Sequence, residues 1–490
     1  MDTPAAPPAP YDLLGVGIGP FNLSLAALAE PAPGLRTLFC DQRPEFRWHP
    51  GMLVDGARMQ VPFLADLVSL VDPTNRWSFL NYLREQDRLF PFYFAERFQL
   101  PRREYDHYCR WAAERLGNCR FGTEVTALHR DGALYRAELR DTATGRRTEV
   151  HARNLALGVG TRPVLPEAFT ALDGHPRAFH SADYLDRRET LDDARDITVV
   201  GSGQSGAEVF LDLLRRVGEG VRLRWLTRTR ALAPMEYSKL GLEHFTPDYT
   251  RYFHGLPGPV RDTLVEAQWQ LHKAASAETL AEIHDHLYER TIGRPIDDAP
   301  VEITPGTAVT DARPGPCGGL ELRCRHGDSG VEHVLRTDAV VLATGYRAAR
   351  PAALEPLAHL IDWDAAGRYR VDLDHRVATL PDLVGGLYVQ NAELHTHGVG
   401  TPDLGLGAHR AAVILNAVAG RTVHRLPERT AWTGFAPPVT PVTPVSPVTP
   451  ATPGGSTGPA APAMGDVPAT ADVPAVPRPQ EWTRAATAGR

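Results

Sequence analysis

Glycines at a strand-to-helix junction are the first residues in this sequence whose types and spacing could do chemistry. Residues 17–22 read GIGPFN, between the apolar run LLGV and an apolar segment with helical spacing. Gly17 permits a tight turn, Gly19 lets the backbone approach a pyrophosphate, and the helix N-terminus offers free N–H groups. The pattern predicts a dinucleotide-binding strand, turn and helix, with Asn22 where a third glycine is usual.

An acid follows at a distance that suits such a site. Residues 36–41, RTLFCD, predict the second strand of the unit and end in Asp41. A carboxylate at this place accepts the hydroxyl groups of an adenosine ribose. The alternative is a glycine turn that serves packing only, beside an acid in a solvated loop.

The same pattern recurs in the middle of the chain, where residues 196–213 read DITVVGSGQSGAEVFLDL. This repeat predicts a second dinucleotide site. The next predicted strand, residues 222–230, carries Thr227, Arg228 and Arg230 where an acid would hold a free ribose. Guanidinium groups there favour a 2′-phosphate, so this site should prefer NADPH to NADH. The alternative is that either arginine lies on a solvated strand end.

Length and composition are typical of an ordinary soluble enzyme with two or three domains. The chain has 490 residues, 43% of them hydrophobic and 23% charged, and exceeds what one core usually serves. The formal net charge of −7 disfavours nucleic acid and anionic membranes as partners. Neither a run of about 18 apolar residues nor a signal-peptide pattern appears, so we expect a cytoplasmic protein.

Cysteine and histidine patterns argue against dithiol and metal chemistry. The five cysteines are scattered and form no C-x-x-C pair, so we expect no disulfide framework, zinc site or dithiol oxidoreductase. His272, His284 and His286 lack a metal-ligand spacing. Surface or core roles are expected for them.

The remaining segments predict the order of the domains. We expect an α/β fold with two Rossmann-like dinucleotide-binding domains, a small and mostly helical substrate region, and a disordered proline-rich C-terminal tail. Residues 103–116 predict a core helix, residues 121–139 a β-meander, and residues 338–346 a strand that returns the chain to the first domain. The expected boundaries are 11–190 and 336–430 for the first domain, 191–235 and 296–335 for the second, 236–295 for the helical region, and 436–490 for the tail.

The segment after Asp41 mixes aromatic, proline and glycine residues with a few polar groups. Trp48, His49 and Gln60 stand in apolar surroundings, as does Asp66. Polar groups need partners when they are buried. A loop that faces a cofactor and a well-paired core both meet this need.

Eight motifs in order resemble those of the siderophore-type flavin N-hydroxylating monooxygenases, the family of lysine, ornithine and diamine N-monooxygenases. They span about residues 11–425 and read GVGIGPFNLSLAAL, PEFRWHPGM, MQVPFLADLV, DPTNRWSFLNYL, VVGSGQSGAE, FTPDY, ATGY and NAELHTHG. The resemblance implies an FAD domain with an inserted NADPH domain, assembled as homo-oligomers. It further implies that a flavin hydroperoxide, formed with dioxygen, hydroxylates a primary amine for hydroxamate siderophore biosynthesis.

The resemblance also assigns site residues. Those expected to bind FAD or NADPH are Gly17, Gly19, Asn22, Asp41, Trp48, His49, Gln60, Val125, Gly201, Gly203, Gln204, Ser205, Arg228, Thr344, Gly345 and Leu406. Those expected to meet the substrate are Gln60, Ala65, Asp66, Leu242, Glu243 and Leu404. No catalytic residue and no metal ligand is assigned, because the flavin carries the chemistry.

Two departures from the family pattern concern the substrate. Branches that act on amino acids usually read FLKDL, with a lysine taken to pair with the substrate carboxylate, whereas this chain reads FLADL with Ala65. The Asn-Glu of the ornithine branch becomes Leu242-Glu243. A carboxylate buried without a cation is costly, so cadaverine or putrescine is expected, with Asp66 or Glu243 as an anchor for the far ammonium.

Two other readings stay open at this point. The nearer one is hydroxylation of the side chain of lysine or ornithine. The other is a nucleotide-binding scaffold whose proline-rich tail recruits partners.

Overall fold

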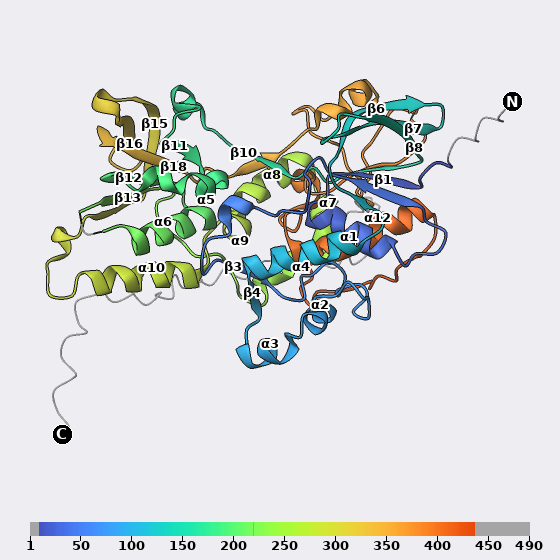
Figure 1. The fold of residues 1–490 in the computed structure, drawn as a ribbon, viewed down its shortest axis with the longest axis horizontal. Helices are drawn as coiled ribbons and strands as arrows, with labels where there is room; N and C mark the ends of the chain where they lie inside the picture. The colour runs from blue at the N-terminus through green and yellow to red at the C-terminus, as the bar shows by residue number, and fades with distance from the viewer. Residues whose placement is uncertain (1–8, 219, 382, 437–490) are drawn as a thin grey trace, which may run out of the picture. The chain divides into compact units, whose positions relative to one another are not determined.

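Two five-stranded parallel sheets organise this protein. The computed structural model describes residues 9–218, 220–381 and 383–436 (Figure 1). Apart from residue 436, the predicted tail at 436–490 lies outside the described residues. Each sheet contains the strand that leads into one of the two glycine-rich turns, as the sequence predicts.

The first sheet takes its strands from both ends of the chain. Its order is β20-β9-β1-β2-β5, and all neighbours pair in parallel. The strands are β1 (Leu13–Val16), β2 (Thr37–Cys40), β5 (Cys119–Arg120), β9 (Leu155–Leu157) and β20 (Leu387–Val389). The central strands are apolar throughout because both faces of a parallel sheet are covered.

Successive side chains of β1 and β2 point to opposite faces of the sheet, so they pack in two different cores. Leu13 and Phe39 pack with helices, and Leu14 and Leu38 pack with an antiparallel sheet. A Cβ on Gly15 would lie 2.0 Å from the Phe39 ring, so this strand needs a glycine there. The helices are α1 (Pro20–Ala29), α4 (Arg102–Arg115) and α12 (Gly407–Ala419), and the antiparallel strands are β6 (Thr123–Asp131), β7 (Leu134–Asp141) and β8 (Arg147–Ala152). The predicted core helix and β-meander are confirmed.

The second sheet repeats this plan with the order β11-β18-β12-β13-β14, again parallel. The strands are β11 (Ala178–His180), β12 (Asp196–Val200), β13 (Arg222–Leu226), β14 (Val301–Thr304) and β18 (Ala339–Leu342). Helix α6 (Gln204–Arg216) follows β12 and packs against α10 (Ala277–Arg290). An antiparallel sheet covers the other face, made of β15 (Thr307–Pro314), β16 (Leu320–His326) and β17 (Glu332–Thr337).

Strand β18 departs from the expected domain order. The sequence predicts that residues 338–346 return the chain to the first domain, but β18 lies inside the second sheet, where Val340 pairs with Ala178 and Thr198. The return comes after it, at β19 (Tyr346–Ala348). This strand pairs antiparallel with β10 (Thr161–Pro163), so both passages between the sheets share one two-stranded ribbon.

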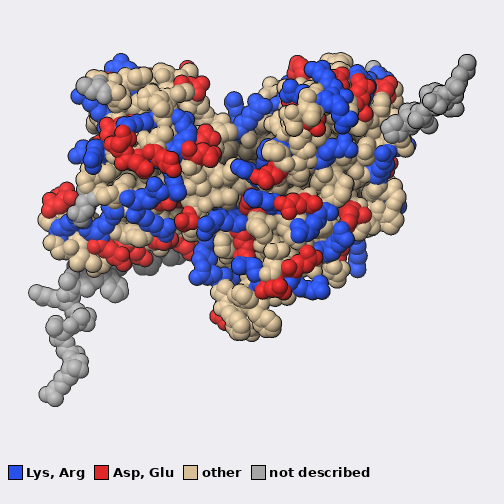
Figure 2. Space-filling view, in the orientation of Figure 1, with Lys and Arg blue, Asp and Glu red and all other residues tan. Residues whose placement is uncertain are grey.

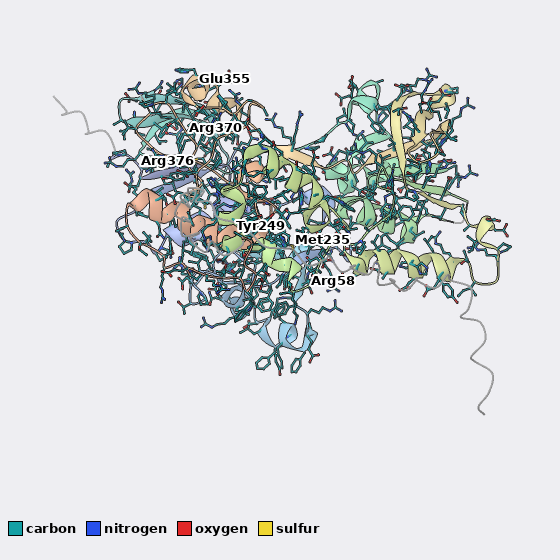
Figure 3. All side chains as sticks on the ribbon, turned by 180° about the vertical axis from the view of Figure 1, so that it is seen from behind. Arg58, Met235, Tyr249, Glu355, Arg370 and Arg376 are labelled. Carbon is teal, nitrogen blue, oxygen red and sulfur yellow. The ribbon has the colours of Figure 1, made fainter. Side chains whose placement is uncertain are left out.

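The predicted helical region at 236–295 divides between two packing partners. Helices α7 (Pro247–His254) and α8 (Gly258–Ala267) contact α11 (Leu394–His397), whereas α10 buries Ile283 in the core of the second sheet. The hydroxyl of Tyr249, labelled in Figure 3, donates to Gln268 at 2.8 Å and ties α7 to the end of α8. The proposed domain boundaries stay a prediction.

The remaining elements are short. They are α2 (Phe79–Glu85), α3 (Leu89–Ala95), α5 (Tyr184–Arg187), α9 (Trp269–His272), β3 (Arg58–Pro62) and β4 (Gln99–Pro101). None of the described helices has both the length and the apolar character that crossing a bilayer requires.

A buried ion pair links α4 to α6. The Arg102 guanidinium donates to both carboxylate oxygens of Glu208 at 2.7 and 2.8 Å, and the two side chains are only 12% and 4% exposed. Arg102 also donates to the carbonyl of Met52 at 3.0 Å. Because burial removes both charges from water, neither partner is stable there without the other.

Replacing Arg102 by alanine should lower the free energy of unfolding by about 3 kcal/mol, because Glu208 would keep a buried and unpaired charge. Denaturant titration measures the change. The neighbouring Arg103 is 66% exposed and pairs with an exposed Asp55 at 3.2 Å, so R103A is the matched control and should change stability little. Equal effects of the two variants would contradict the assignment.

Candidate functional site

One cleft of about 2920 Å³ brings the two glycine-rich turns together. Its wall contains every predicted cofactor residue except Asn22. Of the predicted substrate residues, Gln60, Ala65, Leu242 and Leu404 line it, whereas Asp66 and Glu243 do not. Within the described ranges, no group of three or more His, Cys, Asp or Glu residues is placed to hold a metal ion.

The first turn forms a cradle of backbone at the start of α1. Gly17 has a φ of +84°, and a Cβ on it would lie 2.6 Å from the carbonyl oxygen of Gly158. Gly19 is the N-cap of α1 and no side chain caps it, while the space where its Cβ would stand is open for 4 Å. Free N–H groups at an open helix N-terminus fit the pyrophosphate of a dinucleotide.

Asp41 lies at the end of β2, but its carboxylate is already occupied by the protein. It accepts the N–H of Ile18 at 2.8 Å and pairs with the Arg43 guanidinium at 2.8 Å. Burial alone would raise the pKa of Asp41, yet the hydrogen bonds and the charge of Arg43 outweigh it and hold the pKa below its usual value. Asp41 therefore fixes the turn, in addition to lining the cleft where a ribose is expected.

Asn22 is fully buried and positions the turn from behind. Its amide nitrogen donates to the carbonyl oxygens of Gly17 at 2.8 Å, and of Val16 and Ala156 at 3.3 Å. Its amide oxygen accepts from Gln390 at 2.5 Å. The sequence places Asn22 among the residues that hold FAD, but in the structure it contacts strand ends and not the cleft.

The second turn also has a glycine at positive φ, but its helix N-terminus is less open, since a Cβ on Gly203 would lie 3.0 Å from the carbonyl oxygen of Lys273. Gly201 has a φ of +130°, and a Cβ on it would lie 2.1 Å from the carbonyl oxygen of Ala343. Gly203 caps α6 without a side-chain bond. Gln204 lines the cleft, yet its amide bonds Glu208 at 2.8 Å and the N–H of Ser276 at 2.7 Å, which ties α6 to the start of α10.

Arg228 and Arg230 differ in their surroundings. Arg228 is exposed in the cleft wall, and its guanidinium bonds no other described residue. Arg230 pairs with Asp328 at 2.9 Å and is not part of the wall. The position of Arg228 fits the predicted 2′-phosphate, and Arg230 fits the alternative of a solvated strand end.

Aromatic and amide side chains form the cleft beside the first turn. His49 has a φ of +46°, and burial, assisted by Arg102 and Arg43, lowers its pKa to about 4, so its ring is neutral near pH 7. The amide nitrogen of Gln60 is buried and has no hydrogen-bond partner among the described residues. Such an orphaned donor in a cleft wall fits the carbonyl edge of a flat ring system such as a flavin.

Both predicted ammonium anchors are engaged elsewhere. The Asp66 carboxylate accepts the N–H groups of Val68, Ser69 and Phe79 at 2.6–2.9 Å and so organises the chain that enters α2. The Glu243 carboxylate accepts the N–H of Thr433 at 2.7 Å, far along the chain. Neither carboxylate is free to meet a substrate in the cleft.

Asp403 is the acid that sequence reasoning missed. It lies in the cleft wall beside Leu404, accepts the N–H of Gly405 at 2.6 Å, and burial raises its pKa to about 6. The signal was present in the sequence, since an acid interrupts the glycine-rich stretch TPDLGLG next to a residue already assigned to the substrate.

The two glycine-rich turns line one cleft, and each has the geometry of a dinucleotide site. The class of protein is therefore an α/β fold with two dinucleotide sites. Comparison with known proteins narrows this class. The profile of the L-lysine 6-monooxygenase/L-ornithine 5-monooxygenase family matches residues 9–348. The chain belongs to this family, and the resemblance stated from the motifs is confirmed.

Individual relatives cover most of the chain. A putrescine N-hydroxylase of Shewanella oneidensis is 41% identical over 430 residues, covering 87% of this chain and 84% of that protein. The FAD-bound crystal structure of DfoA, a cadaverine monooxygenase of Erwinia amylovora, is 40% identical with a TM-score of 0.83 and covers 88% of this chain and 99% of its own. An ornithine N-hydroxylase of Kutzneria, solved with reduced FAD, NADP⁺ and L-ornithine, is 27% identical with a TM-score of 0.77 and covers 84% and 99%.

Replacing Asn22 by alanine should weaken binding of FAD, the nucleotide predicted at the first turn, by about tenfold or more, because three carbonyl oxygens and the Gln390 amide would lose their partner. FAD titration followed by fluorescence measures the change. Asn118 makes comparable amide bonds at 3.1 and 3.0 Å to Ala26 and Thr37, so N118A is the matched control. Unchanged FAD affinity in N22A would contradict the positioning role.

Replacing Arg228 by alanine should raise KM for NADPH by about tenfold or more and leave KM for NADH unchanged, since only NADPH carries the 2′-phosphate. Steady-state NADPH and NADH oxidation gives both constants. R230A serves as the control and should alter neither one. If R230A changes the NADPH to NADH preference and R228A does not, the assignment of the two arginines is wrong.

Proposed function

We propose that this protein hydroxylates one primary amine of an aliphatic diamine, cadaverine or putrescine, with FAD, NADPH and dioxygen, for the biosynthesis of a hydroxamate siderophore. The observation that carries the proposal is the buried Ala65 in the cleft wall. Its methyl group offers no charge to a substrate carboxylate, and Leu242 and Leu404 add apolar surface to the same cleft. A diamine brings no carboxylate into such surroundings, whereas the carboxylate of an amino acid would be costly to bury there.

The cofactors supply the hard chemistry when they are bound: NADPH supplies electrons, and FAD activates dioxygen. The chain's own residues prepare the site. The turns at Gly17 and Gly201 would hold the two pyrophosphates, and Gln60 would donate to the flavin ring. The relatives solved with FAD and NADP⁺, and the helix N-termini at Gly19 and Gly203 that no side chain caps, support these assignments.

The protein must also bring the reacting amine to its neutral form. A free alkyl amine has a pKa near about 10.4, so it is protonated at neutral pH and has no lone pair to attack with. An apolar wall such as that of Ala65 and Leu242 lowers this pKa by desolvation. The same wall keeps water away from the reacting atoms.

Asp403 supplies the carboxylate that a diammonium substrate needs. It is a half-buried acid of the wall beside Leu404, and one carboxylate oxygen already caps the turn at Gly405. An ammonium group on the remaining oxygen would restore the charged form that burial disfavours. In our proposal it replaces Asp66 and Glu243 as the ammonium anchor.

Asp403→Asn should raise KM for the diamine by about tenfold above pH 6 with little change in bound FAD, because the amide keeps the cap and loses the charge. The ratio of the two KM values should fall toward one below pH 6, where the wild-type carboxyl, with its pKa of about 6, is itself protonated. Protonation of the amine substrate affects both enzymes and cancels in the ratio. A ratio independent of pH, or a larger effect from E243Q, would contradict the anchor.

The experiment that tests the function measures hydroxylated amine across a panel of cadaverine, putrescine, L-lysine and L-ornithine. The proposal predicts more hydroxylamine from a diamine than from either amino acid. NADPH oxidation alone is uninformative because uncoupled flavoenzymes also consume it. More product from lysine or ornithine would support the amino-acid reading, and bound nucleotide without any amine product would support the scaffold reading.

We also propose that the protein forms homo-oligomers and works in the cytoplasm. The first part is supported by an unusual surface on α3, and the second remains the expectation drawn from the sequence.

A further inference from the structure

Helix α3 presents aromatic side chains to solvent. Phe90, Tyr93 and Phe94 are 75%, 72% and 73% exposed, and no residue of the helix is buried. Figure 2 shows the lobe at α3 as almost free of charged side chains. We call this surface the α3 patch; its residues are Leu80, Leu89, Phe90, Tyr93, Phe94 and Phe98. The Phe94 ring centroid lies 6.4 Å from that of Phe90 and 5.2 Å from that of Tyr93, so these three rings form one exposed cluster. Exposed apolar clusters of this kind mark interaction sites.

The α3 patch is held in place from beneath. Phe92 points inward, with its ring centroid 5.3 Å from that of Phe63 and 5.5 Å from that of Phe79. At the start of the helix, Arg88 donates to Glu104 of α4 at 2.8 Å. A surface that is already ordered loses little entropy when it binds, so it favours association.

The apolar area of the α3 patch is close to the area that a dimer interface buries on each partner. A fully buried aromatic side chain removes about 150–250 Å² from water. At the exposures above, the four aromatic side chains alone offer roughly 400–700 Å², and the two leucines add to this. A standard interface buries about 800 Å² of each partner.

Charges around the patch favour a second copy of the same surface. Three cations and three anions flank it and are all exposed: Arg84, Arg88 and Arg97 with Glu85, Asp87 and Glu96. Two copies related by a two-fold axis can set each sign against the other, which makes the rim self-complementary. A bilayer surface with anionic lipids would select an excess of cations instead.

We propose that the α3 patch is the surface through which two copies of this chain pair, with Phe90, Tyr93 and Phe94 at the centre. The inference deepens the proposed self-association by naming its surface. Phe98 belongs to the patch and also lines the cleft, so the pairing surface continues to the edge of the functional site.

The test compares masses of the full-length protein in solution by sedimentation and light scattering. The double variant F90E/F94E should have half the mass of the wild-type assembly, with unchanged bound FAD as evidence of folding. Ile296, in the 3₁₀ helix Ile296–Asp298, is 79% exposed and lies outside the patch, so I296E should keep the wild-type mass. A single-chain mass for the wild type, or an unchanged mass for F90E/F94E, overturns the proposal.

Two further arms keep the result specific. F94C should form a disulfide-linked dimer on oxidation because a residue near a two-fold axis meets its own copy, and I296C should not. Flotation with anionic vesicles tests a membrane as the other occupant of the α3 patch. If the wild type floats with the vesicles, F90E/F94E does not, and the two proteins have equal masses, pairing is overturned in favour of a membrane surface. Mass is independent of turnover, so failure to hydroxylate diamines bears on the proposed function alone.

Discussion

A single buried amide holds together the carboxyl ends of three neighbouring strands. Asn22 bonds the ends of β1 and β9 and receives the side chain that follows β20. Water cannot replace these bonds in a sealed core, so each is expensive to lose. The first turn and the N-terminus of α1 begin at these strand ends, and the place of the nucleotide therefore depends on a residue that does not line the cleft.

The two halves of the site divide their work between backbone and side chains. At both turns the helix begins with backbone that no side chain caps. Two polar side chains of the wall bond other parts of the protein: Asp41 fixes the first turn through the N–H of Ile18, and Gln204 ties α6 to the start of α10. Side chains matter most where the amine is expected. In our proposal, Ala65, Leu242 and Asp403 decide there which charges the cleft tolerates, so substrate preference could change without disturbing the cofactor sites.

Local chemistry made both turns predictable, because the positive φ of Gly17 and Gly201 is a property of a few consecutive residues. The sheet that receives β18 was not predictable in this way, since a buried apolar strand fits either sheet equally well. Carboxylates were the least predictable part of the site. Glu243 accepts a hydrogen bond from Thr433, 190 residues later in the chain. The residues next to Glu243 in the sequence give no sign of that contact.

The order in which strands enter the sheets also sets when each half of the protein can be completed. β18 fills the middle of the second sheet although it is made after every other strand of that sheet, and β20 joins the first sheet later still. A nascent chain therefore carries two incomplete sheets until β18 (Ala339–Leu342) is made, and one incomplete sheet until β20 (Leu387–Val389) follows. Such late closure of long-range contacts slows folding and exposes the chain to aggregation, which ties yield during synthesis to the residues of these two short strands.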